Sequence, residues 1–327
     1  MEKLAKALVI ILVLLAIAVP LLGKVLTVQP EVVELHARMP ENGDWYPAVI
    51  HGQVNQPIKL RLTSDDVVHG FAVAQSSLPE VEIFPGKYAE TELIFDQPGE
   101  YTFYCTRWCG ANHWRMRGTI IIEGPESAAR PTSEQPLFLK LNLDLDEPHL
   151  AKNLPSSRPD AARGAELAAQ LPSDLDREKT WSVSPETLWQ DLSTVYQAAE
   201  LDDQQVWDMV AWALSLQGGQ DRLAQGKALY TQNCLACHGE SGQGDGVMVR
   251  GLPTMDYSML GGEAVRPPDF SDPAVLLGAS PALLEGKIIR GGMGTGMPYW
   301  GEIFTSEQIQ DLVLYLYTFQ MDIANIP

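Results

Sequence analysis

The sequence predicts a multi-domain chain in three parts: one N-terminal transmembrane helix, then an all-β sandwich, then an all-α domain. Three observations predict this order: an apolar run at the start of the chain, apolar–polar alternation up to about residue 125, and apolar residues at helical spacing beyond residue 160. With 327 residues the chain is long enough for two or three domains. We expect an anchor at 1–24, a sandwich at 25–125, a linker with a helical spacer at 126–217, and a second helical domain at 218–327.

The first element is the apolar run ALVIILVLLAIAV at 7–19, which PLLG follows and which Lys6 and Lys24 flank. With its flanks it has the ~20 residues that span a bilayer as a helix. Lysines before the run place the rest of the chain on the extracytoplasmic side of the cell membrane. The alternative is a cleaved signal peptide, because AIA at 16–18 resembles a small-x-small cleavage site. We therefore expect a single-pass membrane protein whose soluble parts lie outside the cytoplasm.

Charge and cysteine usage limit the function classes. The formal net charge of -19 argues against nucleic acid as a partner. The acidic residues serve either solubility or the steering of a basic partner. The four cysteines form two close pairs beside histidines, whereas a disulfide framework would scatter them. Both pairs are therefore predicted to bind cofactors.

The first cysteine pair lies in FYCTRWCGANHWRM, residues 103–116, between the predicted strands YTFY and MRGTIII. Pro-Gly turns and alternating stretches such as IKLRLTS predict a β-sandwich here, so this stretch is a loop at one end of it. Thiolate, imidazole and thioether are the soft ligands that copper prefers. A disulfide would use the two cysteines but leave the nearby histidine and methionine unexplained. A copper chaperone of the thioredoxin type would need helices between the strands, and the sequence predicts none.

These motifs resemble the CuA domain of subunit II of haem-copper oxidases, over roughly residues 45–123. The resemblance implies a cupredoxin sandwich that holds a dinuclear copper centre. It implies two bridging thiolates, one histidine on each copper, and a methionine sulfur and a backbone carbonyl as weak axial ligands. The implied bridging thiolates are Cys105 and Cys109, and the implied histidines are His69 and His113. The implied weak axial ligands are the sulfur of Met116 and the carbonyl of Arg107.

Arg107 departs from the family pattern, in which most members carry glutamate at this position. Because the backbone oxygen is the implied ligand, the substitution leaves the site possible and places a positive side chain beside it. The single anchor and this residue resemble the ba-type branch of the family. Trp108, inside the same loop, is the candidate partner-facing aromatic residue for electron entry.

The middle of the chain is rich in Pro, Ser and Ala from Ser127 to Arg163, which predicts a linker. Helical periodicity follows in AARGAELAAQL, SPETLWQDLSTVYQAAEL and DDQQVWDMVAWALSLQ. The last of these resembles the C-terminal helix of a c-type cytochrome, although no Cys-x-x-Cys-His precedes it. This region is therefore either a helical spacer or a degenerate cytochrome c-like unit.

The second cysteine pair lies in CLACH at 234–238, the attachment signature of haem c. Cys234 and Cys237 would bond the haem covalently, and His238 would ligate its iron. On the opposite face the loop GGMGTGMPYWG offers Met293 or Met297. The region from about Gly226 to Gln320 resembles class I cytochromes c, whose axial methionine stands in a Met-Pro pair before the final helix. That resemblance favours Met297 and places a haem-orienting proline at 267 or 268.

Two one-electron centres without a general acid–base pair indicate an electron carrier. The resemblance implies subunit II of a haem-copper oxidase with a fused cytochrome c. Electrons would pass from an external donor through haem c and the copper pair to catalytic subunit I, which reduces oxygen to water. The donor would be a cytochrome c, a small copper protein or a quinol-oxidising complex. The alternatives are the equivalent subunit of a CuA-type nitric oxide reductase and a free-standing membrane-anchored electron shuttle.

Overall fold

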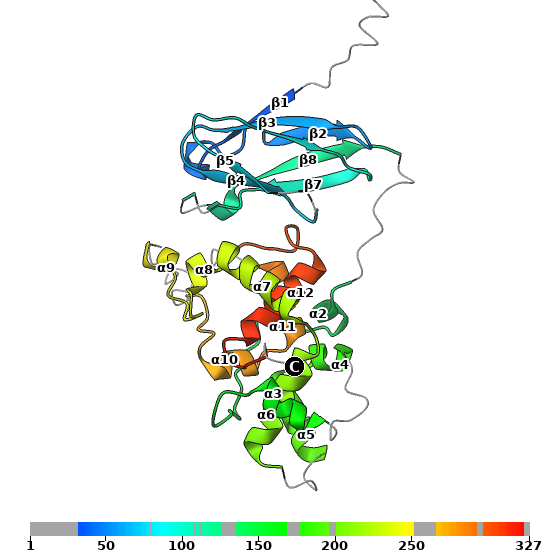
Figure 1. Ribbon diagram of the computed structural model, residues 1–327, viewed down its shortest axis with the longest axis vertical. Helices are drawn as coiled ribbons and strands as arrows, with labels where there is room; N and C mark the ends of the chain where they lie inside the picture. Colours follow the sequence, from blue (N-terminus) through cyan, green and yellow to red (C-terminus); the bar gives the residue numbers. More distant parts are fainter. Residues whose placement is uncertain are drawn as a thin grey trace, which may run out of the picture.

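A computed structural model describes residues 32–323 of the chain, except positions 77, 79, 108, 111–112, 126–134, 169–176, 196–200, 252–265 and 293–296. The anchor predicted at 1–24 lies outside these residues, and no helix within them is long and apolar enough to cross a bilayer. Figure 1 shows a β-sandwich and, further along the chain, a group of helices. The predicted order of an all-β part before an all-α part is confirmed.

The strands of the described residues build the sandwich from two sheets, with the orders β1-β3-β6 and β2-β8-β7-β4-β5. Each sheet contains one parallel pair, β1 with β3 and β2 with β8, and β7 pairs with β8 in antiparallel register. The bounds are β1 Val32–Ala37, β2 Val49–Gln53, β3 Ile58–Ser64, β4 His69–Val73, β5 Val81–Ile83, β6 Ala89–Leu93, β7 Gly99–Tyr104 and β8 Arg117–Glu123, with 3-10 turns η1 Pro40–Asn42 and η2 His113–Arg115.

The sandwich core follows from the period-two pattern of its strands. In β3, Leu60 and Leu62 are buried while the intervening Arg61 is exposed, as expected when successive side chains point to opposite faces. The indole of Trp45 packs edge-on against Phe103 and Phe71, with ring centroids 5.4 Å and 6.0 Å away. This core supports the ends of β4 and β7, where the first cysteine pair and His69 stand.

The helical part contains a run of helices, the last of which ends at Tyr317. Their bounds are α2 Leu137–Lys140, α3 Ala161–Glu166, α4 Arg177–Ser182, α5 Pro185–Val195, α6 Asp203–Ser215, α7 Gln220–Asn233, α8 Leu235–His238, α9 Val247–Gly251, α10 Pro273–Leu277, α11 Pro281–Arg290 and α12 Ser306–Tyr317.

Part of the segment predicted as a linker packs against this helical part. Phe138 and Leu145 are buried, and both lie where a side chain at Gly286 of α11 would extend. The Ala151 amide donates to the carbonyl of Ala274, and further on in the chain Asp160 begins α3 as its N-cap. Composition alone indicated a linker because Pro and Ser interrupt helical periodicity, but interspersed apolar residues are enough to bind such a segment to a preformed helix surface.

The crossing of α7 and α12 positions the second cysteine pair. A Cβ at Gly226 would lie 2.1 Å from the carbonyl oxygen of Asp311, so only glycine allows these helices to approach so closely. One and two turns beyond the glycine, α7 continues to Tyr230 and Cys234. The Tyr230 hydroxyl donates to the carbonyl of Gly239 at 2.7 Å, which ties down the turn that follows the CLACH motif.

Candidate metal centres

The side chains predicted to bind copper come from two places in the sandwich. His69 opens β4, and the remaining ones follow β7 in the loop that leads through η2 to β8. Pairing of Ala72 in β4 with Tyr104 in β7 brings the two places together at one end of the sheet. Residues 36 positions apart in sequence thereby meet.

Cys105 is the centre of the first half of this cluster and is 3% exposed. Its Sγ lies 3.7 Å from Nδ1 of His69 and 3.2 Å from the carbonyl oxygen of Arg107. The imidazole and the backbone oxygen that the resemblance implied therefore both stand beside this thiol.

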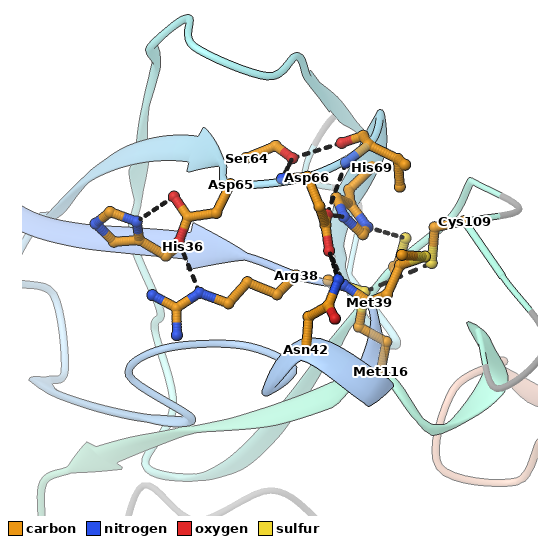
Figure 2. A network of polar contacts seen from close by, with 12 residues as sticks. His36, Arg38, Met39, Asn42, Ser64, Asp65, Asp66, His69, Cys109 and Met116 are labelled. Atoms are coloured by element: carbon orange, nitrogen blue, oxygen red, sulfur yellow. Dashed lines mark hydrogen bonds and ion pairs between the residues drawn. The ribbon is translucent and has the colours of Figure 1, made fainter.

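Cys109 is the centre of the second half. Its Sγ lies 3.6 Å from Nδ1 of His113 and 3.8 Å from Sδ of Met116. The two halves touch, because the ligand atoms of His69, Cys105 and Cys109 lie within 4.8 Å of one another. The structure thus brings all five predicted side chains and the Arg107 carbonyl to one place, partly visible in Figure 2. This soft donor set fits a pair of copper ions.

The two thiols influence each other's ionisation. The hydrogen bond with Cys109 lowers the pKa of Cys105 to about 3, assisted by His113 and His69 and opposed by burial. The same hydrogen bond, together with burial, raises the pKa of Cys109. The pocket therefore favours a thiolate at Cys105, and the thiolate is the form in which cysteine binds metals. Both cysteines are free thiols in the structure.

Asp66 is a residue of this site that sequence reasoning missed. Figure 2 shows its carboxylate beside His69, whose Nε2 donates to Oδ1 of Asp66 over 2.8 Å, leaving Nδ1 to face the thiol of Cys105. Burial opposes the carboxylate, but hydrogen bonds from His69, Asn42 and the backbone lower the pKa of Asp66 to about 2. A carboxylate on the far nitrogen fixes the tautomer and orientation of a metal-binding histidine. The spacing of the aspartate three residues before the histidine in DDVVH was the available signal.

The side chain of Arg107 turns to two carboxylates of the neighbouring strand and turn. Its guanidinium lies 2.9 Å from Glu82 and 3.5 Å from Glu80, and the side chain is 44% exposed. These ion pairs offset the positive charge that replaces the glutamate common in similar domains. Trp108, the predicted electron-entry residue, lies outside the described residues.

The second cysteine pair spans the junction of α7 and α8. Cys234 ends α7, Cys237 lies in α8, and both are free thiols whose pKa values burial raises, to about 12 for Cys234. The ring of His238 is buried and stacks on Phe270, with centroids 4.9 Å apart and planes 9° apart. Burial lowers the pKa of His238 to about 4, which keeps the imidazole neutral as iron ligation requires. Two free thiols beside a buried neutral imidazole fit a covalently held haem.

The hydrogen-bond partner expected for this histidine is not reached. Within the described part of the chain, the buried Nδ1 of His238 has no hydrogen-bond partner. The carbonyls of Pro267 and Pro268 instead point toward the position that a side chain at Gly244 would occupy. Neither proline therefore orients the ring here.

Met297 packs against the core of the helical part, whereas Met293 lies outside the described residues. The amide of Gly292 donates to the Met297 carbonyl at 3.0 Å. Gly291 has a φ of 68°, and a Cβ there would lie 2.5 Å from the carbonyl of Pro298. The glycines of this loop therefore let the Met-Pro segment fold back on the end of α11.

Two family models match the chain. Residues 45–124 match "Cytochrome C oxidase subunit II, periplasmic domain", and residues 223–320 match "Cytochrome c". The first match covers strands β2 to β8 of the sandwich with the six atoms described above, and the second covers α12, most of α7 and the CLACH motif.

Curated relatives named cytochrome c oxidase subunit 2 each match part of the chain. The relative from Thermus thermophilus is 39% identical over 66 residues, which are 20% of this chain and 48% of the relative. The relative from Synechocystis is 29% identical over 77 residues, 24% of this chain and 23% of that protein. The chain thus spans about half or less of the length of these relatives. Among solved structures, a heme-copper terminal oxidase dimer has a chain that is 26% identical, covers 37% of this chain and 99% of its own, and has a TM-score of 0.25.

Proposed function

We propose that this chain, in which a cytochrome c oxidase subunit II periplasmic domain is followed by a cytochrome c domain, is the electron-entry subunit of a membrane haem-copper oxidase. The observation that carries the proposal is the convergence of two thiols, two imidazoles, a thioether and a backbone carbonyl at one end of the sandwich. A buried cluster of this composition suits a metal pair that exchanges electrons.

Cys105 and Cys109 would bridge two coppers, His69 and His113 would each hold one, and Met116 and the Arg107 carbonyl would complete the set. Cys234 and Cys237 would attach the haem, with His238 and Met297 on the two faces of its iron. When bound, each cofactor takes up and releases single electrons. The protein contributes ligands that are already gathered and buried, so little rearrangement accompanies a change of charge.

These ligand sets leave neither metal with a position for a substrate, so the chemistry would take place in another subunit. Electrons would enter from an external donor at the cytochrome domain, pass to the copper domain and leave toward the catalytic subunit, where oxygen is reduced to water. The match to a periplasmic domain supports soluble parts outside the cytoplasm. The apolar run at 7–19 would anchor them to the cell membrane.

The test of this proposal is purification in detergent without separation of partners. Oxygen uptake and nitric oxide consumption are then measured on one preparation with a reduced cytochrome c. The proposal expects rapid oxygen uptake and a polytopic haem-containing subunit in the same preparation. Nitric oxide consumption with little oxygen uptake would instead indicate a nitric oxide reductase, and isolation without any such subunit would indicate a free-standing shuttle.

The ligand assignments are tested by two substitutions in the same preparation. Cys105→Ser should abolish the electron paramagnetic resonance pattern of one unpaired electron shared by two coppers, because a bridging thiolate is lost. Met297→Leu should abolish the far-red band of thioether-ligated ferric haem while the haem stays attached. An unchanged copper spectrum would refute the bridging role of Cys105, and a persistent far-red band would make Met293 the ligand.

A further inference from the structure

The sandwich and the helical part touch through a small set of specific contacts. The amide of Gln75 donates to the carbonyl of Ile303 at 3.2 Å, and its side-chain amide donates to the carbonyl of Gly301 at 3.0 Å. Ala74, at the end of β4, is 3% exposed and belongs to the buried core of the helical part. These contacts join segments that are more than 200 residues apart in sequence, so they arise from docking of the two parts.

A second contact joins the neighbours of two predicted methionine ligands. The guanidinium of Arg117 donates to the carbonyl of Tyr299 at 3.1 Å and lies 4.8 Å from the centroid of its ring. Arg117 directly follows Met116, and Tyr299 stands two residues after Met297. The hydrogen bond and the cation–π stacking together fix both the distance and the orientation of the two segments.

A third contact joins the neighbours of two predicted cysteine ligands. One carboxylate oxygen of Glu80 accepts from the side-chain amide of Gln232 at 3.1 Å, two residues before Cys234. The other oxygen accepts from the hydroxyl of Thr106, which directly follows Cys105. Glu80 therefore connects the end of α7 to the start of the copper loop.

Tyr104, on the other side of Cys105, packs against the core of the helical part. Three residues next to predicted copper ligands thus take part in contacts with the helical part: Tyr104 and Arg117 directly, and Thr106 through Glu80. Two of them reach a residue two positions from a predicted haem ligand. A contact surface unrelated to the cofactors would not be expected to show this coincidence three times.

We propose that this surface, formed by Glu80, Tyr104 and Arg117 of the sandwich and Gln232 and Tyr299 of the helical part, is a fixed docking junction for electron transfer between the two domains. The inference rests on the proposed function and adds to it the residues that set the approach of the two centres. Arg117 and Glu80 act as positioning residues. One electron leaves the cytochrome domain and one arrives in the copper domain, and no bond is made or broken.

The covalent link between the domains strengthens such a junction. A tethered partner is present at a high effective concentration, so a few contacts are enough to keep the docked state populated. Transfer across the junction is then expected to be first order, independent of protein concentration and nearly independent of ionic strength. For a partner captured from solution by charge attraction, the transfer rate would instead depend on protein concentration and change strongly with ionic strength.

The experiment uses the full chain in detergent with copper and haem bound. A photosensitiser reduces the haem in a flash, and the transfer rate is read from the decay of reduced haem and the bleaching of the copper absorbance. The variants are Arg117→Ala and, on the other side of the junction, Tyr299→Ala. The control is Arg61→Ala, which removes an arginine stacked on a tyrosine at 3.9 Å within the sandwich and away from the junction. A second readout is hydrogen exchange at the amide of Gln75, which donates across the junction.

The expected result is a fall in the transfer rate of about tenfold in Arg117→Ala, which loses both the hydrogen bond to the Tyr299 carbonyl and the stacking on its ring. Tyr299→Ala keeps the carbonyl and loses only the stacking, so its rate should fall less, by about threefold. Faster exchange at Gln75 should accompany both falls, with unaltered optical and paramagnetic spectra of both centres. Arg61→Ala should leave rate and exchange unchanged. Wild-type rates and exchange in both junction variants would overturn the junction while leaving the proposed function intact. If the unmodified chain shows no transfer between the centres, the proposed function itself fails.

Discussion

Two helix pairs in the helical part cross in the same way, although only one carries a haem-attachment motif. A side chain at Gly164 of α3 would lie 2.1 Å from the carbonyl of Asp208 in α6, the same clearance that Gly226 of α7 has from Asp311 of α12. Four residues beyond each aspartate an aromatic residue lies under the glycine, Trp212 in one pair and Tyr315 in the other. The crossing therefore does not depend on the haem motif.

The resemblance extends to the ends and charges of the helices. Each second helix begins with a capping box, formed by Asp202 with Gln205 and by Thr305 with Gln308. Each buried aspartate accepts from an arginine of the first helix of its pair, Asp208 from Arg163 and Asp311 from Arg222. The sequence left two alternatives open for residues 126–217, a helical spacer and a degenerate cytochrome c-like unit, and we infer from these shared features that the second is favoured.

The pairs differ in what fills the space beside them. Trp207 of α6 stacks on Trp189 of α5 with centroids 5.7 Å apart, whereas after α7 the ring of His238 in α8 stacks on Phe270. The α3–α6 pair thus packs against indole rings, whereas beside the α7–α12 pair a histidine and a phenylalanine lie where the proposed haem would bind. The same helix crossing is thus accompanied by different side-chain packing in the two pairs.

The largest effect is expected from Trp207→Ala in the first unit, by which we mean the helices α3 to α6; the second unit comprises α7 to α12. Removing a fully buried indole should lower the free energy of unfolding of the first unit by about 3 to 5 kcal/mol, because both transfer energy and packing are lost. Urea unfolding followed by circular dichroism measures this loss. The native haem absorption spectrum should stay unchanged, whereas Phe270→Ala should alter it. A changed haem spectrum in Trp207→Ala would mean that the first unit supports the haem site.

The glycines at the two crossings give the next largest effect. Valine at either position meets a backbone carbonyl that cannot move away, so Gly164→Val and Gly226→Val should each cost about 3 kcal/mol of unfolding free energy. Only Gly226→Val should also displace the far-red haem band, because α7 leads directly to Cys234. Serine variants, with a smaller side chain, should show the same order with smaller losses. Equal haem spectra in both valine variants would show that the crossing does not position the haem.

The sequence predicted which side chains gather in the two candidate ligand clusters better than the packing between the clusters. The clusters at 105–116 and 234–238 were visible because the chemistry of each needs several ligand types at short spacing. The ordered path of residues 135–160 was missed, because its few apolar side chains have no periodicity and become informative only beside α11. The partners across the sandwich–helix junction were invisible for a similar reason: a single arginine and a tyrosine 182 positions apart carry no local pattern.

Asp66 and the two glycines at the helix crossings were less predictable than the ligand clusters and more predictable than the junction contacts. Asp66 stands three residues before a predicted ligand, and Gly164 and Gly226 each lie inside the first helix of a pair, so each position could be read from the sequence. What the sequence lacked was the geometry: which nitrogen of His69 faces the thiol, and which carbonyl lies 2.1 Å from a missing Cβ.

The two arginine–aspartate ion pairs should differ in how much unfolding free energy is lost when the arginine is removed, and both losses should be smaller than those above. Arg222→Ala should cost about 2 to 3 kcal/mol, because Asp311 is 4% exposed and loses a charged hydrogen bond. Arg163→Ala should cost about 1 kcal/mol, since Asp208 keeps the Asp160 amide at 2.9 Å and the side chain of Gln204 at 3.2 Å. Unfolding midpoints of both variants measure the difference. Equal losses would mean that these remaining donors do not compensate Asp208.

The smallest expected effect lies at the capping boxes and tests whether the two second helices begin in the same way. Asp202→Ala and Thr305→Ala should each cost about 1 kcal/mol, because the backbone amide of Gln205 or of Gln308 loses its acceptor. Asp202 also places a negative charge at the positive end of α6, which adds a few tenths of a kcal/mol at low salt. Asp202→Asn keeps the acceptor and removes the charge, so it isolates that part. If salt leaves the difference between Asp202→Ala and Thr305→Ala unchanged, the charge of Asp202 contributes nothing and the two caps are equivalent.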